Sequence, residues 1–208
     1  MDELDATALG RLDVHRHDGH EPFHAGHRML PFTLLDFWQW SSSDVVGNTM
    51  RGILAEYIVG QALNAQGIRD GVREEWATFD LTDTNGVPVE VKSAAYIQTW
   101  AQKTLSAISF KYPKTYDYDP DTGEQSATKT RHAQVYVFAL LKNQDQASID
   151  PLDMDQWEFY VVPTKTLDER QRSQDSITLR SLQAICKPVG FFQVRSSVDC
   201  ASASSHGG

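Results

Sequence analysis

Two short segments of alternating polarity, residues 76–82 and 87–92, constrain the fold of this 208-residue chain more than any other feature. Alternation with a period of two is typical of β-strands that have one buried face and one polar face. The Asn85-Gly86 pair between the two segments favours a tight hairpin connection. The sequence therefore predicts an antiparallel hairpin with one polar face.

The length of the connecting loop decides which side chains face each other across the hairpin. A two-residue turn at Asn85-Gly86 would pair Leu81 with Glu90 and mix the two faces. A three-residue loop over residues 84–86, with Gly86 in the left-handed conformation, instead pairs Leu81 with Val89. Because only the second register keeps apolar residues on one face, it is the register that we predict.

This register gives the polar face a definite chemistry. It sets Asp80 opposite Glu90, with Cβ atoms roughly 4.5–5.5 Å apart, and places Lys92 on the same face. Two carboxylates at that separation repel each other unless a cation lies between them, and oxygen ligands with water suit Mg²⁺ or Mn²⁺. A metal and a lysine together can hydrolyse a phosphodiester bond. The alternative is a surface hairpin in which Asp80 faces an exposed Glu-x-Lys.

A helix is expected before the hairpin, from about Ser43 to Ala65, because apolar residues repeat there at helical spacing. Ser43 or Asp44 can cap its start. Glu56 lies between Gly52 and Gly60, a bare column that lets the helix approach a sheet closely. Glu56 is therefore either part of the predicted site or a solvated helix residue.

The spacing of Asp80 and Glu90-Val91-Lys92 resembles the catalytic pattern of the PD-(D/E)XK, or restriction-endonuclease-like, nucleases, although residue 79 is Phe rather than the Pro of that pattern. Residues 90–100 and 157–164 resemble a bacterial group of stand-alone proteins within this superfamily. The resemblance implies an α/β fold with an α-β-β-β-α-β core, a central mixed sheet flanked by helices.

The resemblance also implies a Mg²⁺-dependent DNA endonuclease that acts in restriction, phage defence or repair, and many relatives are homodimers. In it, Asp80 and Glu90 would bind the metal, the Val91 carbonyl would add a ligand, and Glu56 would complete or support the site. Lys92 would serve the attacking water and the phosphate. The alternative function is a catalytically silent module that binds nucleic acid or a partner protein on the same fold.

Candidate DNA contacts follow the predicted lysine. Ser93 and Gln98 can contact the scissile phosphate or a base, or can instead hydrogen-bond the local backbone. Residues 91–116 contain no acid, and their lysines are Lys92, Lys103, Lys111 and Lys114. The net charge of −9 argues against a general nucleic-acid coat. This basic block is therefore either a solvated face or a surface that faces DNA.

Downstream, residues 135–141 form a nearly continuous apolar run, which is typical of a strand buried on both faces. A further strand is expected over 157–162, closed by Pro163. We expect a short helix over 179–185 and a last strand over 189–194.

Residues 1–30 are predicted to form a flexible arm, residues 31–198 a single nuclease-like domain, and residues 199–208 a disordered tail. Five of the seven histidines lie in the arm: His15, His17, His20, His24 and His27. They can build a zinc site, or the arm can dock a partner protein.

No apolar run approaches the roughly 20 residues that span a bilayer. The acidic N-terminus lacks the layout of a secretion signal, so a cytoplasmic location is expected. Cys186 and Cys200 are then expected to be free thiols.

Overall fold

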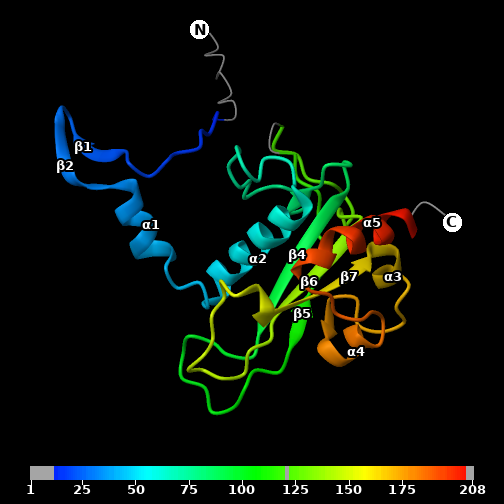
Figure 1. Cartoon of the computed structure of the whole chain (residues 1–208). Helices are drawn as coiled ribbons and strands as arrows, with labels where there is room; N and C mark the ends of the chain where they lie inside the picture. Colours follow the sequence, from blue (N-terminus) through cyan, green and yellow to red (C-terminus); the bar gives the residue numbers. More distant parts are fainter. Residues whose placement is uncertain (1–11, 120–121, 205–208) are drawn as a thin grey trace, which may run out of the picture.

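The computed structural model describes residues 12–119 and 122–204 and is built around a four-stranded mixed sheet (Figure 1). The strands are β3 (Leu81–Thr82), β4 (Pro88–Ala95), β6 (Val135–Leu141) and β7 (Trp157–Pro163), in the spatial order β3-β4-β6-β7. β4 and β6 are parallel, and the two outer pairs are antiparallel. The protein is therefore a mixed α/β structure.

The loop between β3 and β4 has the predicted length and register. Leu81 pairs with Val89, and the Asp83 N–H donates to the Val87 carbonyl across the loop at 3.0 Å. Gly86 has a φ of 81°, in the left-handed region. The Asp83 carboxylate, which is fully buried, accepts two further backbone N–H bonds inside the turn, from Asn85 and Val87.

The first strand of the hairpin is much shorter than predicted. Only residues 81–82 are in strand conformation, and residues 76–80 form turns and bends. Phe79 packs against the cluster on the opposite side of the sheet from Leu81, although both are apolar positions in the alternating pattern. The alternation of residues 76–80 therefore does not reflect a strand.

β6 divides the core into two clusters because its alternate side chains are all buried. Val135, Val137 and Ala139 face a cluster that α2 (Asn48–Leu63) and α5 (Val194–Ser204) cover. Tyr136 and Phe138 face the other side, which is covered by β5, β8, α3 and α4. Their bounds are Ser109–Lys111, Ser176–Thr178, Thr164–Asp168 and Leu179–Gln183. The sheet is thus the middle of three layers.

Helix α2 begins four to five residues later than predicted. The Asp44 carboxylate accepts the Gly47 N–H in a turn outside the helix, and Gly47 itself occupies the N-cap position. The helix ends at Asn64, which is left-handed with a φ of 47°. A Cβ at Gly60 would lie 2.6 Å from Ile68 Cδ1, whereas a Cβ at Gly52 would meet nothing within 4 Å. Only one of the two glycines therefore permits close packing.

The N-terminal region is folded in its described part. β1 (Pro22–Ala25) and β2 (Arg28–Thr33) form a hairpin that leads into α1 (Leu34–Ser42), and both project from the body (Figure 1). The predicted boundary after residue 30 therefore falls within β2. In residues 12–119 and 122–204 no group of three or more His, Cys, Asp or Glu side chains is arranged to hold a metal ion. The described histidines of this region are thus not gathered into such a group.

Two predictions for the C-terminal region are wrong. Instead of a strand over 189–194, the chain forms the short helix η2 (Phe191–Gln193) and then α5; a further short helix, η1 (Met154–Gln156), precedes β7. Residues 199–204 belong to α5 because Val198 and Ala201 are buried in the core, so only residues 205–208 of the expected tail lie outside the described residues.

The α-β-β-β-α-β order is not reproduced element by element. Within the described residues the connection from β4 to β6 contains β5 and no helix. The same described segments contain no helix long and apolar enough to cross a bilayer.

Two glycine substitutions test this account of the backbone. Gly86→Ala is expected to lower the free energy of unfolding by about 1–2 kcal/mol, because alanine is strained at the left-handed φ even though its Cβ has open space. Gly52→Ala is the matched control. It is expected to raise that free energy by about 0.5–1 kcal/mol because it removes a helix-interior glycine without a clash. Urea unfolding measures the change in free energy for both variants. A change of the same sign in the two would contradict the conformations assigned to Gly86 and Gly52.

Candidate active site

The site begins where the β3–β4 ladder stops. Continuing the register beyond Leu81 and Val89 would pair the Val91 N–H with the backbone of residue 79. Instead, the Val91 N–H donates to the Asp80 carboxylate at 2.7 Å. The side chain of Asp80 has therefore replaced the missing strand residue and lies at the open edge of β4.

The same edge exposes a backbone carbonyl. The N–H and C=O of one strand residue point to the same side of the strand. Since the Val91 N–H points away from β6 and toward Asp80, its carbonyl also points to this edge, where β3 has ended. The predicted third oxygen ligand therefore lies on the same side as the Asp80 carboxylate.

Glu90 and Lys92 lie on the face of β4 that carries the aromatic cluster of β6. In the parallel register Glu90 is the neighbour of Tyr136 and Lys92 the neighbour of Phe138. The Lys92 ammonium donates a hydrogen bond to the Glu90 carboxylate, and both side chains are partly buried. Burial and the charge of Glu90 raise the pKa of the neighbouring Tyr136 hydroxyl, so this residue stays a neutral phenol.

The three charged groups are electrostatically unbalanced. Burial, and then the negative charge of Glu90, raise the pKa of the Asp80 carboxyl to about 7, although Lys92 opposes the shift. Burial disfavours the charged Lys92 ammonium, but Glu90 and Asp80 outweigh that effect and raise its pKa. The two carboxylates are therefore close enough to repel, and one ammonium does not compensate both.

Glu56 on α2 lies near Asp80, which favours the first of its two interpretations, and it has a partner that no sequence pattern indicated. Arg73 donates from Nε and Nη2 to the two Glu56 carboxylate oxygens, at 2.6 and 3.0 Å. The Glu56 side chain is 15% exposed. Its charge contributes to the raised pKa of Asp80 and of Lys92, and its hydrogen bonds with Arg73, followed by the charge of Asp80, raise the pKa of Arg73. Residue 73 lies in an irregular segment, so no periodic pattern could have indicated it.

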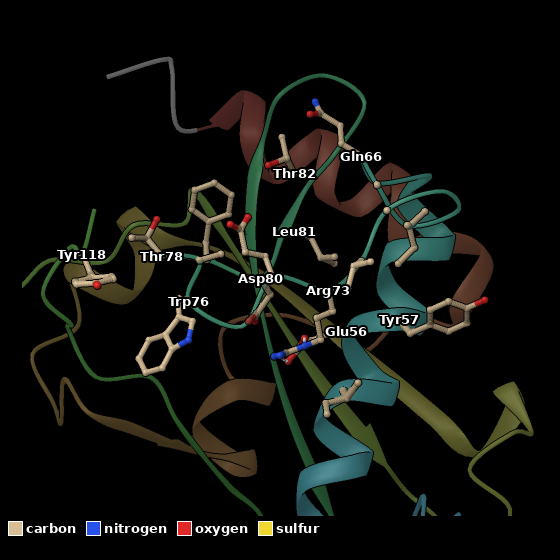
Figure 2. A pocket seen from close by; sticks show the side chains of 18 of the residues that line it. Glu56, Tyr57, Gln66, Arg73, Trp76, Thr78, Asp80, Leu81, Thr82 and Tyr118 are labelled. Carbon is tan, nitrogen blue, oxygen red and sulfur yellow. Dashed lines mark hydrogen bonds and ion pairs between the residues drawn. The ribbon is translucent and has the colours of Figure 1, made fainter. Parts of the chain in front are cut away.

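A cavity of about 850 Å³ opens beside these residues (Figure 2). Asp80, Glu56 and Arg73 line one part of it, and Trp76 and Tyr118 line another. Trp76 is 72% exposed, and its ring centroid lies 6.3 Å from that of Tyr118. Glu90 and Lys92 are outside the lining, so the cavity reaches the site from the Asp80 side.

The candidate DNA contacts just after Lys92 fall in two environments. Ser93 is half-buried in β4, whereas Gln98 is only 7% exposed. The Gln98 amide donates to the Ala95 carbonyl at 2.9 Å and accepts from Arg51 at 3.3 Å. These bonds favour the second of the two interpretations, in which Gln98 hydrogen-bonds local groups.

The three other lysines of the basic block are exposed. Lys111 lies on β5, Lys103 lies in the loop after β4, and Lys114 is 3.7 Å from the Asp168 carboxylate. None of them contacts Asp80, Glu90 or Lys92 through a hydrogen bond or ion pair in the described part of the chain. Lys103 and Lys111 are therefore available for long-range attraction of an anion, whereas Lys114 is paired with Asp168.

The donor set fits a Mg²⁺ ion better than a metal that requires a complete protein cage. The Asp80 carboxylate and the Val91 carbonyl lie at the β4 edge, and Glu90 interacts electrostatically with Asp80 from the adjoining face. Mg²⁺ commonly keeps several waters and takes only one or two carboxylates from the protein. The mutual repulsion of Asp80 and Glu90 is the effect that a bound cation would relieve.

Comparison with known families finds one match over most of the chain. Residues 34–181 match the family described as Bacteriophage T4 endonuclease IV. The match begins at α1 and includes the whole four-stranded sheet with Glu56, Asp80, Glu90 and Lys92. No curated protein matches the chain significantly.

The unbalanced charges at the site are expected to affect the free energy of unfolding when no metal is bound. Asp80→Asn keeps an acceptor for the Val91 N–H and removes a buried charge. It is therefore expected to raise the free energy of unfolding by about 1 kcal/mol in EDTA. Lys92→Met is expected to lower it, because it leaves the carboxylates without their cation. Denaturant unfolding of both variants tests the imbalance; stabilisation by Lys92→Met would contradict it.

Gln98 provides a second test. Gln98→Ala is expected to lower the free energy of unfolding by about 1–3 kcal/mol, because it removes buried hydrogen bonds and leaves Arg51 with fewer partners. Gln144→Ala, at an exposed glutamine, should change that free energy by less than about 0.5 kcal/mol. If Gln98→Ala instead weakened DNA binding without changing stability, Gln98 would be a DNA contact after all.

Proposed function

The chain belongs to the Bacteriophage T4 endonuclease IV family, and we propose that it is a Mg²⁺-dependent endonuclease that hydrolyses phosphodiester bonds in DNA. Family membership supports a nuclease that acts on DNA. The observation that carries the finer proposal is the convergence of Asp80, Glu90 and Lys92 at the open edge of β4. Acidic groups from two segments and a lysine are the side chains that this reaction requires.

Asp80, Glu90 and the Val91 carbonyl would hold the metal. A bound Mg²⁺ would supply Lewis-acid polarisation of a phosphoryl oxygen and a water of lowered pKa. The Lys92 ammonium can donate to a non-bridging phosphate oxygen, where negative charge increases in the transition state, and can orient the attacking water. Its ion pair with Glu90 holds the ammonium over the carboxylate face before substrate arrives.

Glu56 acts in this proposal through Arg73 and through its charge. Both of its oxygens accept from Arg73, so the pair is preorganised without a metal. Glu56 then supports the site by its negative charge near Asp80. Arg73 keeps that carboxylate oriented at the wall of the cavity and adds a positive charge that a phosphate can approach.

We also propose that the chain is a PD-(D/E)XK nuclease with a restriction-endonuclease-like core. The mixed sheet flanked by helices, the helix before the hairpin and the Asp80 and Glu90-x-Lys92 spacing support this assignment. The non-helical connection between β4 and β6 is a departure from the α-β-β-β-α-β order that this chain would then carry.

Cleavage assays test the proposed activity. Plasmid, linear and single-stranded DNA are incubated with the protein and Mg²⁺, Mn²⁺ or EDTA. Wild-type protein is expected to cut with either metal and not with EDTA. Asp80→Asn, Glu90→Gln and Lys92→Met are each expected to slow cleavage at least about 100-fold. Asp155→Asn, at an exposed acid before β7, is the matched control and should cut like wild type.

Calorimetric titration with Mn²⁺ supplies a readout that does not depend on cleavage. Asp80→Asn and Glu90→Gln should weaken binding at least about tenfold, whereas Asp155→Asn should bind like wild type. If no DNA is cut in any condition while DNA is still bound, the chain is the catalytically silent module instead. Cleavage that persists in EDTA would exclude the metal-dependent mechanism.

A further inference from the structure

A second cavity, of about 750 Å³, lies on the side of the molecule formed by β8 and α4. Three arginines line it, Arg170, Arg172 and Arg180, and Thr178 and Ser181 add two hydroxyl groups to the lining. No acidic side chain is among its lining residues. This is an unusual composition for one cavity of a chain with a net charge of −9, so it requires an explanation of its own.

Strand pairing connects this cavity to the basic block around residue 111. β5 and β8 are antiparallel, and Lys111 pairs with Ser176. Phe110 and Ile177, the inward residues of the two strands, are buried against the aromatic cluster of the sheet. The exposed Lys111 therefore lies on the same two-stranded layer as the arginine cavity. This layer covers the sheet face on which Glu90 and Lys92 lie.

The three arginines of the cavity differ in whether their guanidinium groups already have hydrogen-bond partners. Arg170 donates to the Tyr112 hydroxyl, and its Nη1 is 3.3 Å from the Ser173 carbonyl. Arg172 and Arg180 are exposed, and within the described residues their side chains make no hydrogen bond or ion pair. Two guanidinium groups are therefore available for a ligand.

The neighbouring Arg131, by contrast, already has hydrogen-bond and ion-pair partners. Its side chain is 0% exposed, and it contacts the Asp168 carboxylate and the Gln174 side chain and backbone. Asp168 is thus occupied by Arg131 and by Lys114. Asp168 is therefore paired with cations other than the three arginines of the cavity.

The cavity matches the chemistry of a phosphate group. A guanidinium group presents a planar set of donors that fits phosphate oxygens in a bidentate manner. Thr178 donates its hydroxyl proton to the Ser181 oxygen, so the Ser181 hydroxyl retains its own proton for a ligand. The two guanidinium groups and the Ser181 hydroxyl together offer more hydrogen-bond donors than a single ion pair on the surface uses.

We propose that this arginine cavity binds backbone phosphates of DNA at a distance from the cleaved bond, with Arg172 and Arg180 as the phosphate contacts. The identity of the ligand as DNA rests on the proposed function. The cavity lies on the layer that also carries Lys111 and that packs on the sheet face of Glu90 and Lys92, so this layer adds positive charge on that side of the sheet. In an acidic chain, such a surface gives DNA a defined approach.

DNA binding in EDTA tests the cavity without cleavage. Fluorescence anisotropy with a labelled oligonucleotide is measured from low to moderate salt for wild type and for the Arg172→Glu/Arg180→Glu double variant. The variant is expected to bind at least about tenfold more weakly at low salt. The slope of log affinity against log salt should fall by about 1–2, because two phosphate contacts are lost.

The control has the same change in net charge on other surfaces. Arg28→Glu/Lys187→Glu alters two exposed cations, one on β2 and one after α4 and outside the arginine cavity. Its slope of log affinity against log salt should stay close to that of the wild type. Equal losses in the two double variants would mean that only net charge matters, which overturns the proposal. Thermal unfolding is measured for both, and Arg172→Gln/Arg180→Gln replaces the glutamate variant if that variant is unfolded.

Further outcomes separate this proposal from the proposed nuclease activity. Wild-type protein that binds DNA through these arginines but never cuts it would refute the nuclease and leave the cavity assignment intact. Wild-type protein that cuts DNA while the double variant binds like wild type would refute only the cavity. Inorganic phosphate that binds the cavity while the double variant leaves DNA affinity unchanged would assign it to a small anion and overturn the proposal.

Discussion

The hydrogen bond from the Val91 N–H to the Asp80 carboxylate is the interaction on which the arrangement of the site depends. It ends the β3–β4 ladder after two residues and leaves most of β4 with a free edge. A longer β3 would have covered that edge with backbone and would have hidden the Val91 carbonyl. A strand that stops early, with the Asp80 side chain accepting the next backbone N–H, therefore opens the edge of β4 and places a carboxylate there.

The burial of charge around this edge follows from the same geometry. Asp80 and Glu90 approach each other on a partly buried face, and Lys92 offsets only part of their repulsion. Glu56 adds to that repulsion, although both of its oxygens accept hydrogen bonds from Arg73. The fold thus holds like charges close together at this site. Such an arrangement reduces stability, and under the proposed function a bound cation would relieve the repulsion.

The two core clusters explain how a rigid sheet can carry such a site. β6 is buried along its whole length, with valines toward the helices and aromatic residues toward the β5–β8 layer. β4 is held against it by a parallel register over seven residue pairs, so Glu90 and Lys92 cannot shift relative to Tyr136 and Phe138. The helical layer on the other face brings Glu56 to the edge, and the β5–β8 layer brings in the arginine cavity.

The sequence by itself determined the features that depend on neighbouring residues. These are the three-residue loop ending at Gly86, the pairing of Leu81 with Val89 and the fully buried strand at 135–141. Local sterics and the hydrophobic pattern decide each of them, and the same pattern placed Glu90 and Lys92 on one face of β4.

Only the tertiary structure decided what depends on residues far apart in the chain. Examples are the hydrogen bonds of Arg73 to Glu56 and of Arg51 to the buried Gln98. Another is the pairing of β5 with β8, which places Lys111 on the same layer as the arginine cavity. It also decided that residues 76–80 leave the sheet despite their alternating pattern. Alternation shows which faces a strand would have, but it does not show whether a neighbouring strand is there to form the backbone hydrogen bonds.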